Sequence, residues 1–264
     1  MNKLLNLVKS YLSLKSNTFA GYKIIKKTPI DQTKHKCIWQ VADYDLYSGK
    51  RKKIVGSKEI LVGIDFTVNF LKKQNSTYKV LIVSSNSVDA AKIKKTLIDF
   101  FDAVFVVDNL GLDLGSHKAG FKIMNDLYSE VSSFPFVVSN SSFNPIDSKA
   151  INSLLTFSSQ ENVLIGVSYA YGPRYYLLKR MHLQSFFLIS NYRNFKYIFN
   201  KLKLGTNNKL KIIRDGEIKI SEIALKRKLA LICYDGNVFR IFNEPLYSFF
   251  FYDHRSTHDC INSL

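Results

Sequence analysis

Residues 103–124, AVFVVDNLGLDLGSHKAGFKIM, decide the fold class of this chain. They open with an unbroken apolar run rich in β-branched side chains, which is typical of a strand buried on both faces. Glycines at 111 and 115 follow, and apolar residues then recur at helical spacing. The pattern predicts a strand over 103–109 that leads through a glycine-containing turn into a helix over about 115–130.

The same alternation continues on both sides of this stretch. We expect further strands at 37–45, 78–86, 134–142 and 162–170, and helices at about 58–74, 88–101 and 147–158. Continuous apolar strands separated by helices indicate a parallel sheet that is covered on both faces. In such sheets ligands bind at the carboxyl ends of the strands.

After residue 170 this alternation stops. We expect a loop at 171–176, a strand at 181–190, a basic amphipathic helix over 191–204, a helix capped by Ser221, and a hairpin turning at Asp235-Gly236. Residues 1–16, MNKLLNLVKSYLSLKS, place apolar residues on one stripe with lysines elsewhere. We therefore treat 1–36 as a basic amphipathic N-terminal segment that either packs on its own domain or lies on a membrane surface.

The composition points to an anionic partner. The chain has 264 residues, with 38 Lys and Arg against 21 Asp and Glu, which gives a formal net charge of +17. Such a charge suits nucleic acid, an anionic membrane surface or phosphorylated substrates. Three widely spaced cysteines exclude a disulfide framework, and no apolar run is long enough to cross a membrane. We expect a cytoplasmic protein with free thiols.

The expected strand ends are small and polar, as a nucleotide site requires. They are Ala42-Asp43, Ser84-Ser85-Asn86, Asp108-Asn109 and Ser139-Asn140-Ser141-Ser142. Glycines after the third strand let the backbone approach a ligand, and the following helix offers free N–H groups to a phosphate. Lys118, about one turn into that helix, is placed to reach a diphosphate. The element is neither a dinucleotide GxGxxG nor a Walker motif.

Three segments, in order, resemble one family. NLGLDLGSHKAG (109–120) is similar to the NxGxDxGxxKxG element of the rhamnan-synthesis F family and related bacterial surface-polysaccharide glycosyltransferases. FVVSNSSFNPID (136–147) resembles their strand ending in NDS, and HLQSFFLIS (182–190) resembles their HLQSYFL strand. The resemblance covers roughly residues 38–235. It implies a GT-A-like α/β fold with a mainly parallel Rossmann-type sheet flanked by helices, similar to family 2 glycosyltransferases.

The resemblance also implies that the chain has two functional halves and a donor site. A nucleotide-sugar-binding half would span 37–170, and a smaller acceptor-binding half with a C-terminal tail would span 171–264, both within one continuous domain. The implied donor-binding residues are Ala42, Asp43, Asn86, Asn109, Gly111, Asp113, Lys118, Asn140, Ser141 and Ser142.

Metal dependence stays open. Residues 140–142 stand where most GT-A enzymes carry an Asp-x-Asp metal ligand, and Asn and Ser are poor substitutes for carboxylates around Mg²⁺ or Mn²⁺. Either the chain is metal-independent, with Lys118 or Arg174 steadying the diphosphate, or Asp113 supplies one carboxylate to a weakly held metal.

The acceptor side follows from the later motifs. His182 and Gln184 would share one face of a strand and, with Arg174, contact acceptor or donor sugars. An inverting transferase needs a carboxylate to deprotonate the acceptor hydroxyl. Glu217 is the first candidate and Asp215 the second, because family 2 enzymes often present a Glu-Asp pair before a helix; Glu222 caps that helix or pairs with a lysine.

The function expected from these features is a glycosyltransferase, inverting in mechanism, at the inner face of the cell membrane. It would move a sugar from a nucleotide-sugar to a lipid-linked acceptor of a growing cell-surface glycan such as O-antigen, capsule or rhamnan-type polysaccharide. One alternative is a catalytically silent nucleotide-binding relative, which the missing Asp-x-Asp favours. The other is a basic nucleic-acid-binding protein, although the RNP, KH, zinc-finger and basic-zipper signatures are absent.

Overall fold

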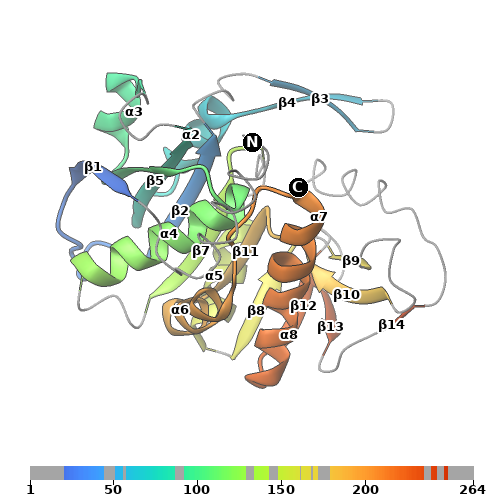
Figure 1. Cartoon of the computed structure of the whole chain (residues 1–264). Coiled ribbons are helices and arrows are strands. Elements are labelled where there is room, and N and C mark those ends of the chain that lie inside the picture. The colour runs from blue at the N-terminus through green and yellow to red at the C-terminus, as the bar shows by residue number, and fades with distance from the viewer. Residues whose placement is uncertain are drawn as a thin grey trace, which may run out of the picture.

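In the part of the chain that the structure describes, nine strands form the central sheet (Figure 1), in the order β1-β6-β5-β2-β7-β11-β8-β12-β13. The computed structural model describes residues 21–44, 51–55, 58–86, 92–128, 134–142, 148–160, 162–167, 169–171, 179–234, 239–242 and 247–248. The strands of this sheet are β1 Tyr22–Lys27, β2 Cys37–Tyr44, β5 Thr77–Ser85, β6 Ala103–Asp108, β7 Pro135–Asn140, β8 Val163–Gly166, β11 Phe187–Asn191, β12 Ala230–Tyr234 and β13 Phe239–Phe242.

The sheet is mainly parallel, as the sequence predicts. Strands β6, β5, β2 and β7 pair in parallel, and β8 and β12 run in the same direction. Strands β1, β11 and β13 run the opposite way. The expected α/β class with a Rossmann-type sheet is therefore confirmed.

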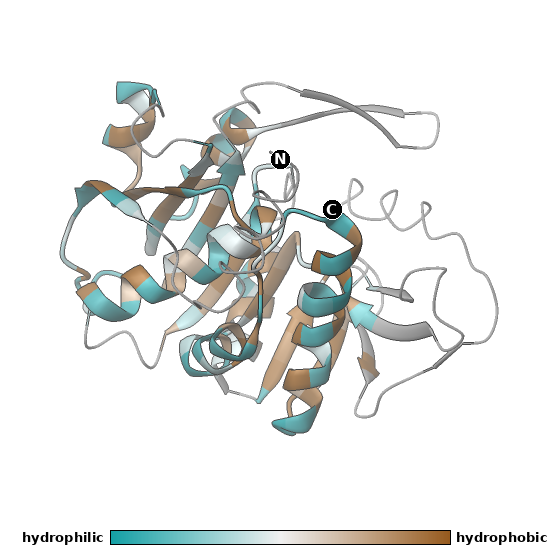
Figure 2. Cartoon of the chain, in the orientation of Figure 1, coloured by the Kyte–Doolittle hydropathy of each residue, from teal (hydrophilic) through white to brown (hydrophobic). Residues whose placement is uncertain are grey.

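Helices cover both faces of this sheet. One face carries α2 (Ile64–Leu71), α3 (Lys95–Phe100) and α5 (Ser148–Gln160), and the other carries α4 (Leu112–Leu127), α6 (Tyr192–Lys201) and α8 (Lys219–Lys226). Alternation along each strand produces the two layers: in β5, Val80 and Ile82 join the α4 side, whereas Leu81 and Val83 join the α2 side. Figure 2 shows the result as apolar strands between helices with polar outer surfaces.

The strand order places a topological switch between β2 and β7. From β2 the chain steps outward to β5 and then β6, and it returns to the other side of β2 with β7. In open α/β sheets, ligands bind in the crevice that such a reversal leaves at the carboxyl ends of the strands. The candidate site is therefore sought where β2 and β7 end.

The C-terminal half adds antiparallel structure and one long helical rod. Strand β11 inserts between β7 and β8, while β10 (Lys179–Leu183) belongs to a small sheet with β9 (Tyr169–Tyr171) and β14 (Tyr247–Ser248). Helix α7 (Lys209–Ile212), the π-helical segment η2 (Ile213–Ile218) and α8 follow one another without a break. The predicted hairpin is confirmed by the antiparallel pairing of β12 with β13.

Several predicted boundaries were wrong. The helix expected at 58–74 begins only at Ile64, because 58–62 form strand β4, which pairs with β3 (Arg51–Val55) in a separate two-stranded sheet. Helix α3 begins at Lys95 rather than 88, and 92–94 precede it without helical structure. Gly63, at φ 139°, marks the break between β4 and α2.

Two further corrections affect the site. The strand expected at 181–190 is two strands, β10 and β11, joined by a turn at 184–186, so Gln184 lies outside either strand. Ser221 does not cap a helix: it lies inside the rod, where its Oγ accepts a hydrogen bond from the Leu183 backbone N–H at 3.0 Å. The predictions for 1–16 and 172–176 fall outside the described residues, and in the described part of the chain no helix is long and apolar enough to cross a membrane.

Candidate functional site

Two polar clusters meet at the carboxyl ends of β2 and β7. Asn140 and Ser141 come at the end of β7, and backbone bonding continues past the strand because the Ser141 N–H donates to the Ala42 carbonyl at 2.9 Å. Alternation sends the two side chains to opposite faces. Asn140 lies on the face that carries α4, and Ser141 lies toward Asp43.

Asp43 and Ser141 form the first cluster. The Asp43 side chain is buried, and its Oδ1 accepts a hydrogen bond from the Ser141 hydroxyl. Ser84, at the end of β5, donates to the Asp43 backbone carbonyl at 3.4 Å. The predicted convergence of the strand ends is thus present for Asp43, Ser84 and Ser141.

The second cluster is a line of four side chains that runs from the sheet to the start of α4. Gln40 Nε2 lies 3.0 Å from His117 Nδ1 and also donates to the His117 carbonyl at 3.2 Å. His117 Nε2 lies 3.2 Å from Asn140 Oδ1, and Asn140 Nδ2 donates to Asp113 Oδ2 at 2.7 Å. We call these four residues the Gln40–Asp113 relay.

The relay has a fixed direction. Burial lowers the pKa of His117 to about 4, although the hydrogen bond with Asn140 opposes that shift. The ring is therefore neutral near pH 7 and carries a single N–H. Because Gln40 presents an amide N–H to Nδ1, the ring proton lies on Nε2 and is donated to Asn140 Oδ1. Asn140 then turns its amide nitrogen toward the Asp113 carboxylate.

A glycine-containing loop fixes the position of Asp113 at the start of α4. Gly111 is the N-cap of α4 and has a left-handed backbone at φ 82°, and a Cβ on Gly115 would lie 1.7 Å from the Leu110 carbonyl oxygen. Asn207 fastens the loop by accepting from the Gly111 N–H at 2.8 Å and donating to the Asn109 carbonyl at 2.7 Å. Helix α4 starts at Leu112, so Asp113 lies in its first turn and not in a preceding loop as predicted.

Lys118 lies in the helix, as the sequence predicts, and has a partner that the sequence does not indicate. It is in the second turn of α4, and its ammonium donates to the Leu202 carbonyl at 2.7 Å. Burial, with a smaller contribution from Lys122, lowers its pKa. Lys118 thus fastens the linker after α6 to α4. Its contact with a diphosphate stays a prediction.

The third group comes from the C-terminal half. Glu217, in the π-helical segment η2, accepts a hydrogen bond from the Ser185 hydroxyl at 2.8 Å, and its other oxygen lies 3.7 Å from His182 Nε2. His182 is buried, whereas the Glu217 side chain keeps 23% of its surface exposed. π-Helical turns occur frequently at functional sites. A partly exposed carboxylate beside a buried imidazole is an arrangement suited to accepting a proton from a substrate.

One backbone contact joins this group to the relay. The Asn140 N–H donates to the Phe186 carbonyl at 2.9 Å, and Phe186 directly follows the serine that holds Glu217. The two halves of the chain therefore meet at Asn140. Asp113, in α4, is thus bonded to Asn140 directly, and Glu217, in η2, is linked to it through Ser185 and the Phe186 backbone.

The remaining predicted residues are more dispersed. Asp215 is exposed and forms a two-pronged ion pair with Arg214. Asn86 is exposed at the end of β5 and donates to the Tyr44 hydroxyl at 3.1 Å, whereas Ser142 and Gln184 are half-buried. The Asn109 carbonyl contacts Asn207, and Arg174 lies outside the described residues.

The donor set at Asn140 does not suit Mg²⁺ or Mn²⁺. These ions favour carboxylate oxygens, but residue 140 is an amide: its oxygen faces His117, and its N–H group rather than an oxygen faces Asp113 Oδ2. Across the described ranges no three His, Cys, Asp or Glu side chains gather into a metal-binding group.

Sequence reasoning missed four residues of the site. Gln40 and His117 complete the relay, Ser185 holds Glu217, and Asn207 fastens the glycine loop. A glutamine inside the apolar run CIWQVADYD was a usable signal, because a buried polar side chain needs a partner. No local pattern marks Asn207, which acts across 96 residues of sequence.

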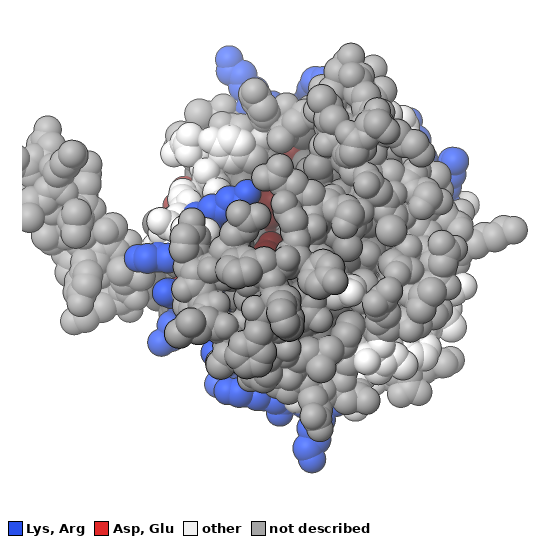
Figure 3. All heavy atoms as spheres, turned by 90° about the vertical axis from the view of Figure 1, so that its right-hand side faces the viewer, with Lys and Arg blue, Asp and Glu red and all other residues white. Residues whose placement is uncertain are grey.

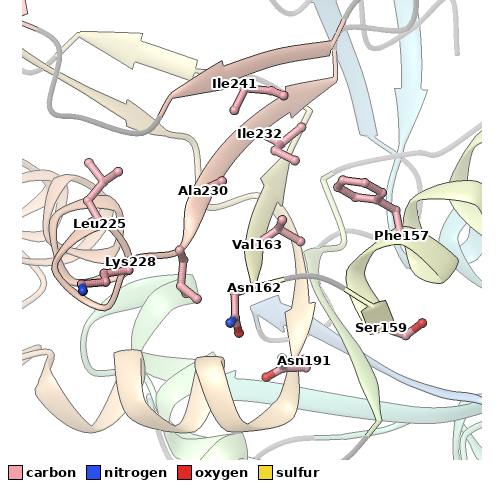
Figure 4. A pocket seen from close by; sticks show the side chains of 11 residues that line it. Phe157, Ser159, Asn162, Val163, Asn191, Leu225, Lys228, Ala230, Ile232 and Ile241 are labelled. Atoms are coloured by element: carbon pink, nitrogen blue, oxygen red, sulfur yellow. The ribbon is translucent and has the colours of Figure 1, made fainter.

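A pocket lies at the opposite edge of the sheet. It has a volume of about 740 Å³ and is bounded by the starts of β8 and β12, the end of α5 and the residues after α8. Figure 4 shows Phe157, Ile232 and Ile241 around its apolar part, with Asn162 and Asn191 toward the other end. It is separate from the strand ends that carry Asp43 and Asn140.

Comparisons with known proteins give a distant structural likeness. No protein-family model and no curated protein matches the sequence. The crystal structure of 4-diphosphocytidyl-2C-methyl-D-erythritol synthase is similar to this chain, with a TM-score of 0.46 and 13% identity over 77% of this chain and 91% of that one. A likeness of this degree implies nothing about activity.

Proposed function

We propose that this protein is a glycosyltransferase that binds a nucleotide-sugar at the carboxyl ends of β2 and β7. The observation that carries the proposal is that two carboxylates are linked to Asn140 at the switch in strand order. Asp113 accepts from the Asn140 side chain, and Glu217 accepts from Ser185, whose neighbour Phe186 accepts from the Asn140 backbone N–H. The three sequence motifs contribute Asp113, Asn140 and Ser185, so the resemblance to surface-polysaccharide glycosyltransferases and the geometry support the same site.

The donor side would be formed by the strand ends and the start of α4. Asp113 offers a carboxylate to a sugar or ribose hydroxyl, and Asn140 holds that carboxylate in place. Asp43, at the end of β2, carries a buried carboxylate that accepts from Ser141. It offers the same chemistry on the opposite face of the sheet. Backbone N–H groups in the first turn of α4 have no acceptor within the helix and would stabilise the negative charge of a diphosphate.

The acceptor side would be formed by Glu217. Its carboxylate takes the proton from the acceptor hydroxyl while the oxygen attacks the anomeric carbon, and the bond to the diphosphate oxygen breaks so that the nucleoside diphosphate leaves. Ser185 and His182 hold the carboxylate, and Asp215 is committed to Arg214. Direct attack from the face opposite the leaving group inverts the anomeric centre.

A basic surface supports an anionic acceptor at a membrane. Residues 192–228 contain eleven Lys and Arg against three Asp and Glu, and each of the three acids is bound to a neighbouring side chain. Figure 3 shows Lys and Arg along one side and the lower margin of the described surface. We call the outer surface of α6, α7 and α8 the basic face; it also exposes Tyr197 and Leu210.

The proposed acceptor is a lipid-linked saccharide of a cell-surface glycan. Its diphosphate and the surrounding anionic lipid would both be attracted to the basic face, where each lysine contributes on the order of 1 kcal/mol near a charged membrane. Exposed Tyr197 and Leu210 supply apolar contact among these lysines, as interfacial helices do.

A product assay tests the proposed reaction. Purified protein is incubated with each of a panel of nucleotide-sugars and a membrane extract that contains lipid-linked saccharides, and released nucleoside diphosphate is measured. We expect release with one donor, which Glu217→Gln slows by at least about 100-fold. Donor binding without release in any extract would instead indicate a silent nucleotide-binding relative.

A further inference from the structure

We propose that the hydrogen bond from Asn140 to Asp113 takes the place of a divalent metal ion at this site, so that donor binding here requires no Mg²⁺ or Mn²⁺. The inference deepens the proposed function by specifying how its donor site is held together. The resemblance to GT-A glycosyltransferases implies a metal ion bound by an Asp-x-Asp element at this strand end. The residues present, Asn140-Ser141-Ser142, do not fit a metal ion.

Both ends of the Asn140 amide are already engaged. Its oxygen, the only atom of the side chain able to ligate a cation, accepts from His117 Nε2 at 3.2 Å. Its nitrogen donates to Asp113 Oδ2 at 2.7 Å. A metal ion beside Asp113 would therefore meet an N–H group of Asn140 where it needs an oxygen.

The relay prevents the amide from turning over. A flipped Asn140 would aim its N–H group at the Nε2–H of His117 and its oxygen at the Asp113 carboxylate, so both contacts would be repulsive. His117 in turn keeps its proton on Nε2 because Gln40 donates to Nδ1. Gln40 is itself fixed by its second bond to the His117 backbone carbonyl.

An aspartate at position 140 would reverse this chemistry. Its carboxylate would lie at hydrogen-bond distance from Asp113, and two carboxylates that close cannot both stay ionised without a cation or a proton between them. Two adjacent carboxylates are also the oxygen donors that Mg²⁺ and Mn²⁺ favour. One isosteric change thus separates an amide-held site from a metal-held one.

Binding of Mn²⁺ to the isolated protein tests the inference. Free Mn²⁺ is titrated by electron paramagnetic resonance into the wild-type protein, Asn140→Asp and the double variant Asn140→Asp/Asp113→Asn. We expect no saturable site that depends on Asp113 in the wild type. Asn140→Asp should bind about one equivalent of Mn²⁺, with an affinity at least 10-fold above any binding by the wild type. The double variant should lose this site. Asn86→Asp, which adds the same charge at the end of β5, is the matched control and should resemble the wild type.

Two results would overturn the inference. One is saturable Mn²⁺ binding by the wild-type protein that Asp113→Asn removes, an outcome that can be read even if Asn140→Asp fails to fold. The other is a folded Asn140→Asp protein that binds Mn²⁺ no better than Asn86→Asp. Because the titration contains no nucleotide, its result does not depend on whether the protein transfers sugars, and failure of the proposed function would be seen separately in the product assay.

Discussion

His117 stabilises the fold only while it is neutral. It is fully buried, and its neutral ring bridges two side chains: Nδ1 accepts from Gln40, and the Nε2–H donates to Asn140. A proton added to Nδ1 would lose the Gln40 bond and place an unpaired charge in the core. Burial holds its pKa at about 4, below the ordinary value of 6.5.

The stability of the protein should therefore depend on pH through His117. Between pH 6.5 and pH 4 the unfolded chain binds a proton at this residue and the folded chain does not, so the free energy of unfolding falls by about 1.4 kcal/mol per pH unit as pH falls. Urea unfolding at pH 7, 6 and 5 measures the slope. His117→Gln should lower stability at pH 7 and flatten the slope by that amount. Equal slopes in the two proteins would contradict the assignment of a neutral, buried ring.

The two candidate bases should behave differently. Glu217→Gln removes the proton acceptor but keeps a partner for Ser185, so we expect transfer to slow by about 100- to 10,000-fold with donor affinity unchanged. Asp215→Asn is the matched control, because that carboxylate is exposed and engaged with Arg214. Turnover at several acceptor concentrations measures both. Loss of activity in Asp215→Asn, with Glu217→Gln unaffected, would move the base to Asp215.

Single residues of the site were predictable where a strand end or a sequence motif carried them. Asp113 and Asn140 stand in the quoted segments, and Glu217 was predicted from the acidic pair before a helix. In the structure Asp113 bonds to Asn140, and Glu217 bonds to Ser185. The contact of Lys118 was not predictable, because its partner is a backbone carbonyl 84 residues away. Ser185 and Asn207 act through contacts that pattern alone does not reveal.

At the scale of elements, the start of α4 depends on a close approach that only glycine allows. A Cβ on Gly115 would meet the Leu110 carbonyl oxygen at 1.7 Å, which no side-chain movement relieves because the obstacle is backbone. Gly115→Ala should destabilise the protein by about 1–3 kcal/mol, despite the helix propensity that alanine gains. Gly21→Ala, whose Cβ would meet nothing within 4 Å, is the control and should change stability by less than about 0.5 kcal/mol in urea unfolding.

The parallel strands were predicted well and the irregular elements poorly. Strands β2, β5, β6 and β7 are long apolar runs that no other structure accommodates easily. The apolar residues of segment 58–62 are compatible with the spacing of a helix or of a strand. The segment is a strand because it pairs with β3. The turn between β10 and β11 contains no glycine or proline, so one continuous strand was the natural expectation.

At the scale of the whole molecule, charge should direct the protein to anionic membranes. We expect binding to phosphatidylglycerol vesicles that falls with salt and is negligible on phosphatidylcholine. Reversing Lys196, Lys201, Lys209 and Lys211 to Glu on the basic face should weaken it by more than about 100-fold. The same reversal at Lys72, Lys73, Lys92 and Lys94, exposed near the ends of α2 and α3, is the control. Equal loss in both variants, or sequence-selective RNA binding without vesicle binding, would contradict a membrane role for this face.

The most direct test of the account is nucleotide binding at the carboxyl ends of β2 and β7. Thermal unfolding is followed with millimolar nucleoside diphosphates, nucleoside monophosphates and nucleotide-sugars, in EDTA and in Mn²⁺. A ligand at about 100 times its dissociation constant adds roughly 2.7 kcal/mol to the free energy of unfolding. We predict that one nucleotide raises the melting temperature equally in EDTA and in Mn²⁺. Asp113→Ala should remove this shift, and Asp215→Asn should keep it. No shift with any nucleotide, or a shift that survives Asp113→Ala, would contradict a donor site at this edge.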